Sequence, residues 1–394
     1  MGRRILCLAC LFTCAASPMA KGAYTGAVLY QLTPPSGSSF AIASGTSETA
    51  SGGQVVGFDL PPASGTNDAV YWTESGTPID LSSSAYEYSH ALGTDGVQQV
   101  GTAYPAGSTS FNNQATLWSG TPESAVDLNP DGFMNSTALG VNGDHQVGYA
   151  QTATTQDAML WTGNAGSAVD LNPTNLTGFS DTTALASSGN QQVGNGEFGP
   201  VATQTSHALL WSGTADSAVD LNPTLLTGFT DNFATGTSGS QQVGYGQYNS
   251  PGGGANNHAL LWSGTADSAL DLNPDGISES EAFGVFGGLQ VGEGDGSAML
   301  WFGSPDSAVD LQLLLPADGA WTGSVAYSID GSGNIYGTAN GTLDDVTGTY
   351  AVEWSPVPEP ASLSLLVVAA PALLARRRRT TGRVNVALRP SWMP

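Results

Sequence analysis

The chain has 394 residues and a net charge of −24, yet no lysine or arginine occurs between Lys21 and Arg376, the interval that holds all 33 acidic residues. A surface without cations cannot displace counterions from phosphates, which excludes nucleic acid and anionic membrane surfaces as partners of this region. All three cysteines (Cys7, Cys10 and Cys14) precede the interval, so disulfides and cysteine-ligated metals are excluded there as well.

Residues 1–23 have the organisation of a secretory signal peptide. Two arginines near the start precede the apolar run 5–12, and small residues follow it. The run is too short for a permanent membrane anchor, so we expect export and cleavage near Ala20 or Ala23.

Residues 24–355 repeat one unit with a period of roughly 47 residues, which lies in the range of propeller blades. Each unit has a Gln-Val-Gly segment or a close variant of it, then an apolar run that ends in tryptophan, and in all but the last unit an Asp-Leu pair. The tryptophans are Trp72, Trp118, Trp161, Trp211, Trp262, Trp301 and Trp354.

Four short apolar segments separated by turn residues make up each unit, which predicts an all-β fold. In the fifth unit they cover residues 233–236, 242–245, 259–262 and 269–272. The third segment has consecutive apolar residues, so we expect its sheet to be buried on both faces. The first segment is rich in small residues, as expected for the innermost strand around a central axis.

The two ends of the repeat region complement each other. The chain enters with residues 27–34, which resemble the fourth segment of a unit, whereas the last unit stops after Trp354. Open sheet edges promote aggregation. We therefore predict a seven-bladed β-propeller of four-stranded blades, closed by an N-terminal strand that completes the last blade.

Residues 356–379 combine a Pro-Glu-Pro triplet, an apolar run over 361–375 and a cluster of arginines. They resemble the PEP-CTERM sorting signal of exported bacterial proteins, carried by Pro358, Glu359, Pro360, Arg376, Arg377, Arg378 and Arg379. The resemblance implies cleavage by exosortase-type processing machinery after transient inner-membrane anchoring. It also implies a final place at the cell surface or in the extracellular matrix of a Gram-negative-type bacterium.

The length of the apolar run, about 15 residues, is marginal for a transmembrane helix, and polybasic flanks stay on the cytoplasmic side. The signal normally ends soon after its arginines, whereas here a tail over 380–394, expected to be disordered, follows them. An ordinary C-terminal anchor is the alternative interpretation of this region.

The repeat also resembles the HAF-type repeat of exported bacterial proteins, in which His-Ala-Phe-Leu-Trp follows a Gly-x-Val-Val-Gly strand. The nearest matches here are residues 53–57, 207–211 and 258–262. This resemblance implies a propeller blade and export, and it specifies no activity.

Catalytic motifs are missing from the sequence, which has no Gly-x-Ser-x-Gly elbow, Cys/His pair or phosphate loop. His207 and His258 share one repeat position, which favours a structural role. We therefore expect a protein that is not an enzyme and has no cofactor. Acidic pairs such as Asp344 with Asp345 and Glu279 with Glu281 could in principle act in glycoside hydrolysis, but in an acidic chain such pairs arise by chance.

Two segments imitate the start of a calcium loop, with candidate ligands at Asp127, Asn129, Asp131, Asp271, Asn273 and Asp275. Neither has a glutamate at the twelfth position, and Asn-Pro-Asp-Gly also suits a type I turn. We favour the turn, because other units keep Asp-Leu-Asn-Pro without the second carboxylate.

Ligand recognition is expected on the face of the disc formed by the loops between strands two and three of a blade and those between blades, which vary most. The candidate residues are Tyr86, Tyr88, Tyr104, Phe111, Phe198 and Tyr248. The main hypothesis is a secreted, non-enzymatic binding or structural propeller for extracellular polysaccharide or a surface protein. The alternatives are a propeller enzyme, either a glycoside hydrolase or a lyase acting on extracellular polysaccharide, and a calcium-stabilised surface protein.

Overall fold

The computed structural model describes residues 23–35, 41–49, 52–60, 66–73, 75–107, 112–250 and 254–357. The predicted sorting signal from Pro358 onward, the tail, Phe111 and all but the last residue of the predicted signal peptide lie outside these ranges. Within them, no helix combines the length and the apolar character needed to cross a membrane. The apolar run 361–375 is not part of the described chain.

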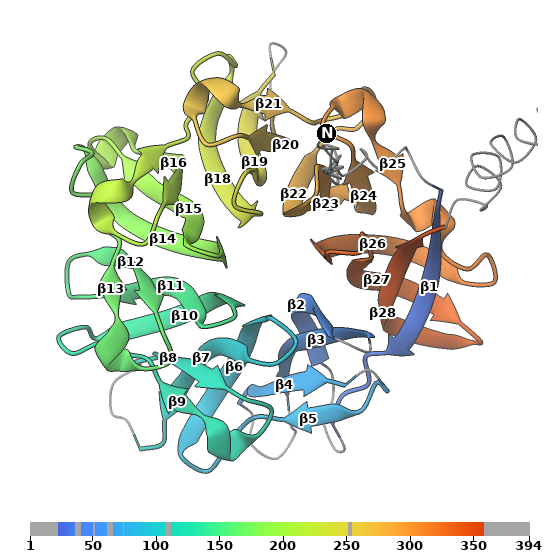
Figure 1. Cartoon of the computed structure of the whole chain (residues 1–394). Helices are drawn as coiled ribbons and strands as arrows, with labels where there is room; N and C mark the ends of the chain where they lie inside the picture. The colour runs from blue at the N-terminus through green and yellow to red at the C-terminus, as the bar shows by residue number, and fades with distance from the viewer. Residues whose placement is uncertain are drawn as a thin grey trace, which may run out of the picture. The chain divides into compact units, whose positions relative to one another are not determined.

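Seven four-stranded antiparallel sheets are arranged in a ring (Figure 1). Blade one contains β2 (Ala41–Thr49), β3 (Gly52–Asp59), β4 (Asp68–Trp72) and β5 (Pro78–Asp80), and blade two contains β6 (Tyr86–Thr94), β7 (Gln99–Pro105), β8 (Gln114–Trp118) and β9 (Val126–Asp127). Blade three contains β10 (Asn135–Asn142), β11 (His145–Gln151), β12 (Gln156–Trp161) and β13 (Val169–Asp170). The predicted fold class is confirmed.

The remaining blades repeat this order. Blade four contains β14 (Phe179–Ser188), β15 (Gln191–Phe198), β16 (Thr205–Trp211) and β17 (Val219–Asp220), and blade five contains β18 (Phe229–Thr237), β19 (Gln242–Asn249), β20 (Ala255–Trp262) and β21 (Leu270–Asp271). Blade six contains β22 (Ser280–Phe286), β23 (Leu289–Gly294), β24 (Ser297–Trp301) and β25 (Val309–Asp310). Blade seven combines β26 (Ala320–Ile329), β27 (Ile335–Leu343) and β28 (Val346–Pro356) with β1 (Tyr24–Gln31).

Short 3-10 turns connect some of these elements. They are η1 (Pro122–Ser124), η2 (Ala165–Ser167), η3 (Val201–Thr203), η4 (Ala215–Ser217), η5 (Ala266–Ser268), η6 (Pro305–Ser307) and η7 (Gln312–Leu314). Five of them lie in the loop between strands three and four of a blade, where the sequence repeats a Ser-Gly-Thr-Ala-Asp-Ser pattern.

The ring closes through β1, which pairs antiparallel with β28 from Tyr24 opposite Pro356 to Gln31 opposite Tyr350. This confirms the predicted closure by the N-terminal strand. The strand begins earlier than the predicted residue 27, because β28 continues to Pro356 and offers partners over that length. The indole Nε1 of Trp354 donates to the carbonyl of Leu311 at 2.7 Å and ties blade seven to blade six.

The core lies between blades and follows from the repeated pattern. In β20, Ala259, Leu260, Leu261 and Trp262 are all buried, so both faces of the strand are covered as predicted. One cluster joins Val193, Ala208, Leu210 and Leu221 of blade four to Ala234, Leu260 and Trp262 of blade five. The innermost strand of each blade is its first, such as β14 or β18 (Figure 1).

The glutamine of the Gln-Val-Gly motif ties strands two and three together. The side-chain oxygen of Gln242 accepts a hydrogen bond from the backbone N–H of Gly264 at 2.8 Å, and Gln290 does the same with Gly303 at 2.8 Å. A buried amide that satisfies a turn N–H in this way explains why the residue recurs.

Candidate functional site

One repeat position places a residue of the first strand directly opposite a residue of the second strand in every blade. Outside blade six, these pairs are Ile42–Phe58, His90–Thr102, Thr137–Tyr149, Thr183–Asn195, Phe233–Tyr245 and Val325–Thr338. Burial lowers the pKa of His90 to about 4, so that pair is also uncharged at neutral pH. In blade six the pair is Glu281 and Glu293.

Glu281 and Glu293 project from the same face of their sheet, because directly opposite residues of an antiparallel pair have Cβ atoms roughly 4.5–5.5 Å apart. Together with Glu279 and Asp295 they line a small cavity of about 70 Å³. The cavity lies where β22 begins and β23 ends, so it opens on the face of the ring predicted to bind ligands.

Burial raises the pKa of both paired carboxyl groups, and negative neighbours raise it further. For Glu293 these neighbours are Glu281 and Glu279. For Glu281, a hydrogen bond from the side-chain amide of Asn257, at 2.6 Å, opposes the shift, while the charge of Glu279 adds to it. The two carboxyl groups therefore have different environments, and Glu281 is the one with a donor that stabilises its charged form.

The backbone of blade six holds this pair closely. A Cβ atom at Gly292 would overlap the carbonyl oxygen of Glu281, so only glycine permits the approach of β22 to β23. Asp295, whose φ of 48° is unusual for a residue other than glycine, accepts hydrogen bonds from the N–H groups of Ser278 at 3.0 Å and Glu279 at 3.1 Å. The loop that carries Glu279 is fixed in this way.

The sequence predicted part of this site. Glu279 and Glu281 were paired by proximity in the chain, and the structure adds Glu293 and Asp295 to them. Glu293 can be found from the repeat pattern. It stands three residues after Gln290, at a position where the other repeats carry uncharged residues. The other acidic pair, Asp344 and Asp345, forms the turn between β27 and β28 with φ angles of 50° and 63°.

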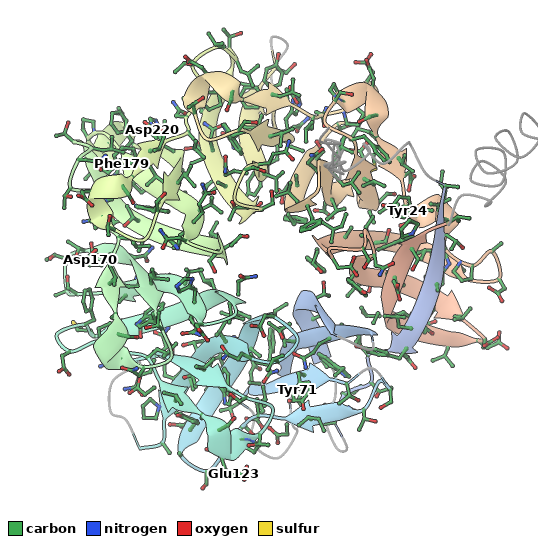
Figure 2. The ribbon with its side chains drawn as sticks, viewed as in Figure 1. Tyr24, Tyr71, Glu123, Asp170, Phe179 and Asp220 are labelled. Atoms are coloured by element: carbon green, nitrogen blue, oxygen red, sulfur yellow. The ribbon has the colours of Figure 1, made fainter. Side chains whose placement is uncertain are left out.

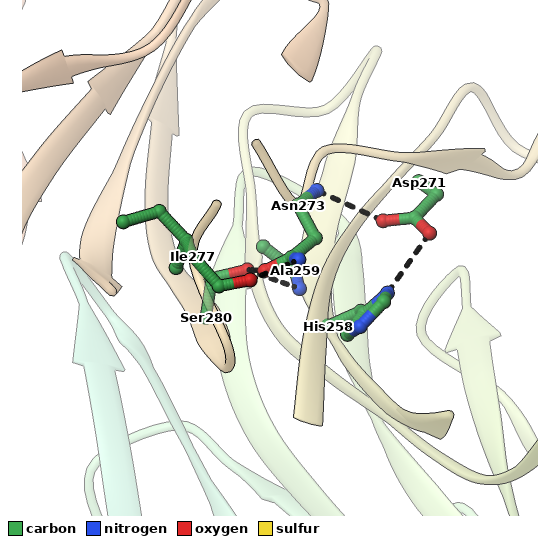
Figure 3. Close-up of polar contacts among 6 residues, drawn as sticks. All are labelled: His258, Ala259, Asp271, Asn273, Ile277 and Ser280. Atoms are coloured by element: carbon green, nitrogen blue, oxygen red, sulfur yellow. Dashed lines mark hydrogen bonds and ion pairs between the residues drawn. The ribbon is translucent and has the colours of Figure 1, made fainter. Parts of the chain in front are cut away.

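A larger cleft of about 650 Å³ lies on the same face, over blade five and between the segments that lead into it from blade four and out of it to blade six. Residues that line it include Phe229, Tyr248, His258, Asp271, Asn273 and Asp275. Nδ1 of His258 lies 3.0 Å from Oδ2 of Asp271 (Figure 3), and the ring of Tyr248 stacks on His258 with centroids 4.6 Å apart. Tyr248 is therefore the predicted ligand-face residue that lines this cleft.

The other predicted ligand-face residues belong to other blades. Tyr86, Tyr88 and Tyr104 belong to blade two, where the rings of Tyr88 and Tyr104 meet edge to face at 5.1 Å. In blade four, Phe198 stacks on His207 at 4.5 Å, beside Phe179 and Asp220 (Figure 2). These aromatic residues pack within their own blades and do not join Tyr248 in one site.

Four of the six calcium-loop candidates, Asp127, Asn129, Asp271 and Asn273, make hydrogen bonds within the protein. Oδ1 of Asp271 accepts from the N–H of Asn273 at 2.8 Å, and Oδ1 of Asn273 accepts from the Ser280 hydroxyl at 2.6 Å (Figure 3). Asp127 and Asn129 make the same contacts in blade two. The first of these bonds recurs at Asp170 and Asp220, whose turns lack a second carboxylate. In the described chain, no group of three or more His, Cys, Asp or Glu residues is placed to hold a metal ion.

No protein-family model and no curated protein matches the chain. Among solved structures, it is similar to the β-propeller domain of the trilobed protease from Pyrococcus furiosus, with 10% identity and a TM-score of 0.50, covering 80% of this chain and 94% of that one. It is also similar to the acylaminoacyl peptidase of Pyrococcus horikoshii, with 11% identity and a TM-score of 0.48, covering 83% of this chain and 54% of the peptidase. For the tricorn protease, the values are 11% identity, a TM-score of 0.31, and coverage of 82% and 32%.

The expectation that the chain is not an enzyme is contradicted, because the solved β-propeller that it resembles with a TM-score of 0.50 is a domain of a protease. The sequence-based expectation rested on missing motifs, and it treated acidic pairs as chance products of an acidic chain. At 10% to 11% identity the likeness shows the fold alone.

Proposed function

We propose that the protein is a hydrolase of neutral extracellular polysaccharide, with Glu281 and Glu293 as its pair of catalytic carboxyl groups. One observation carries the proposal: two carboxylates lie directly opposite each other at a position where the other six blades have uncharged pairs. Like charges in this arrangement destabilise a sheet. Residues that destabilise the fold at one place in an otherwise regular repeat are characteristic of functional sites.

The geometry suits glycoside hydrolysis, in which two carboxyl groups flank the scissile bond at a separation of roughly 5–9.5 Å. A Cβ separation of about 5 Å favours the shorter, retaining arrangement. Glu293, whose pKa is raised without an opposing hydrogen bond, is the general acid that protonates the glycosidic oxygen. Glu281, whose charged form Asn257 stabilises, is the nucleophile that bonds to the anomeric carbon. Water then hydrolyses this intermediate, with Glu293 as the general base.

Charge restricts the substrate. No lysine or arginine lies between Lys21 and Arg376, so a uronate would meet carboxylates and find no cation to neutralise it. This supports a neutral polysaccharide over an acidic one. It also supports hydrolysis over a lyase reaction, because β-elimination requires a uronate in the substrate.

We also propose that the protein acts outside the cell, at the surface or in the matrix, after processing of the signal over residues 356–379. The support is the order of features in the sequence, with a signal peptide at 1–23 and the Pro-Glu-Pro triplet followed by arginines. Intact-mass measurement of the exported protein tests this, and retention of Arg376–Arg379 in the mature form would contradict processing.

The hydrolase proposal is tested by measuring new reducing ends when purified protein is incubated with a panel of neutral polysaccharides. We expect turnover by the wild type and a loss of about 10²-fold or more for Glu281→Gln and Glu293→Gln. Glu123→Gln is the matched control, because Glu123 is an exposed residue of η1, in a loop between the third and fourth strands of blade two and therefore on the opposite face. Wild-type protein without turnover on the panel, or full activity in both site variants, would contradict the proposal.

A further inference from the structure

The large cleft over blade five is joined to the acidic cavity by one segment of the chain. The segment between β21 and β22 lines the cleft from Asn273 to Ser278 and then lines the acidic cavity from Glu279 to Glu281. The cleft volume of about 650 Å³ lies within the range of small-molecule sites. A polysaccharide bound at the acidic pair can therefore extend along this segment into the cleft.

Several polar groups in the cleft are free to bind a ligand. Among the residues that the structure describes, neither the hydroxyl of Tyr248 nor Nε2 of His258 has a hydrogen-bond partner. A carboxylate only accepts hydrogen bonds, so Nδ1 of His258 carries the hydrogen that faces Asp271, and Nε2 is left to bond a ligand. Asp275 adds an exposed carboxylate at the rim.

The groups around these free atoms are held rigidly. Asp271 contacts both His258 and the N–H of Asn273, and Asn273 also donates to the carbonyl of Ile277 at 2.9 Å (Figure 3). Phe229 packs beside the stacked pair, with its ring centroid 5.3 Å from that of Tyr248. A pocket with fixed aromatic walls and a few free donors and acceptors is typical of a preformed ligand site.

Blade four provides a built-in comparison. It has the same stacked ring, histidine and aspartate, but Phe198 stands where blade five has Tyr248, so the hydroxyl is missing. Thr224, which follows the fourth strand of blade four, occupies the same repeat position as Asp275, which follows the fourth strand of blade five. The hydroxyl of Thr224 donates to Asp267. The packing is therefore shared by both blades, whereas the Tyr248 hydroxyl and the Asp275 carboxylate are particular to the cleft.

We infer that this cleft is a recognition subsite for an uncharged sugar unit of the polysaccharide bound at Glu281 and Glu293. The inference rests on the proposed function for its link to that pair. The Tyr248 hydroxyl donates to or accepts from sugar hydroxyls, Nε2 of His258 forms a hydrogen bond with them, and the carboxylate of Asp275 accepts from them. Without any cation in the cleft, an acidic sugar has no counter-charge there.

The inference is tested by calorimetric titration of neutral tetrasaccharides of glucose, mannose and galactose into the full chain carrying Glu281→Gln and Glu293→Gln, which cannot turn them over. We expect Tyr248→Ala to weaken binding by about tenfold or more, and Tyr248→Phe, which keeps the packing, by about threefold to tenfold. Phe198→Ala, the matched change in blade four, is expected to leave the affinity unchanged.

The outcomes separate this inference from the hydrolase proposal. Binding that depends on Tyr248 without turnover by the wild type would leave the subsite standing and overturn the hydrolase. Turnover whose KM is unaffected by Tyr248→Phe and Tyr248→Ala would overturn the subsite and leave the hydrolase. Failure of every tetrasaccharide to bind, or equal weakening by Phe198→Ala and Tyr248→Ala, would also overturn the subsite.

Discussion

Blades five and six have the same backbone and opposite chemistry at the position where their first two strands face each other. In blade five the pair is Phe233 and Tyr245, whose rings stack with centroids 5.0 Å apart. In blade six it is Glu281 and Glu293. In both blades a glycine, Gly244 or Gly292, permits the same close approach of the two strands.

The difference teaches that the repeat fixes the place of a side chain and leaves its chemistry free. The stacked rings stabilise blade five, whereas the carboxylate pair opposes the folding of blade six. Burial and the charge of Glu281 raise the pKa of Tyr245 to about 12, so this neighbouring phenol stays neutral and adds no charge to the site. At this position, where the first two strands of a blade face each other, a pairing that is unfavourable for stability thus occurs only in blade six.

The largest effect is expected from separating the roles of the two glutamates. Glu293→Gln should lower kcat on polysaccharide by about 10²–10⁴-fold, because it removes the general acid. It should lower kcat much less on 4-nitrophenyl glycosides, whose leaving group departs without a proton, whereas Glu281→Gln should impair both. Steady-state kinetics on the two substrate types measures this, and equal losses for Glu293→Gln on both would contradict the assignment of the acid.

The reverse exchange tests the stability side of the comparison. Phe233→Glu combined with Tyr245→Glu gives blade five the pair of blade six, and we expect a loss of about 2 kcal/mol in the free energy of unfolding. The stacked rings contribute about 0.5–1.5 kcal/mol beyond the area that they bury, and the new like charges lie opposite each other. Urea unfolding measures the change. Unchanged stability would mean that the position tolerates a pair of charges in any blade. The pair Glu281–Glu293 would then no longer indicate a functional site.

The fold was predictable because the information is repeated. Seven tryptophans, each fully buried, mark the third strand of each blade, and the missing fourth strand of the last unit indicated where the N-terminus must pair. Where one unit departs from the repeat, the other units still define the pattern, so the number of blades and the closure could both be deduced from the sequence.

The site was predicted only in part because it depends on a departure from the repeat. Glu293 is not close to Glu281 in the chain, and the two meet only through the register of β22 with β23. The cleft depends on the two segments that flank blade five and on the stacking of Tyr248 on His258, which no spacing rule specifies. Aromatic residues placed on the same face by topology, such as Tyr88 and Tyr104, instead packed against each other.

A smaller effect is expected from the pH dependence of stability in blade six. The folded-state pKa values of Glu281 and Glu293 lie above the usual 4.5, so ionisation of the pair opposes folding, and stability falls as pH rises through the raised values. Glu281→Gln with Glu293→Gln should therefore raise the melting temperature at pH 7.5, and the gain should shrink toward pH 4. A gain that is the same at both pH values would show that the carboxylates do not repel each other.

The smallest effect is expected at Asp68, where repulsion occurs without a proposed function. Burial, with the charges of Asp80 and Asp59, raises its pKa to about 6 from 3.8, so ionisation opposes folding and the penalty develops as pH rises between these values. Asp68→Asn should raise the melting temperature by about 1–2 °C at pH 7, have no effect near pH 4, and leave turnover unchanged. In blades four and five the equivalent residue is a histidine that contacts the aspartate of the fourth strand, His207 with Asp220 and His258 with Asp271. This position therefore serves to connect the third and fourth strands. Loss of turnover in Asp68→Asn would show that a raised carboxyl pKa in blade one also serves the reaction, and the contrast between blade six and the rest of the ring would no longer hold.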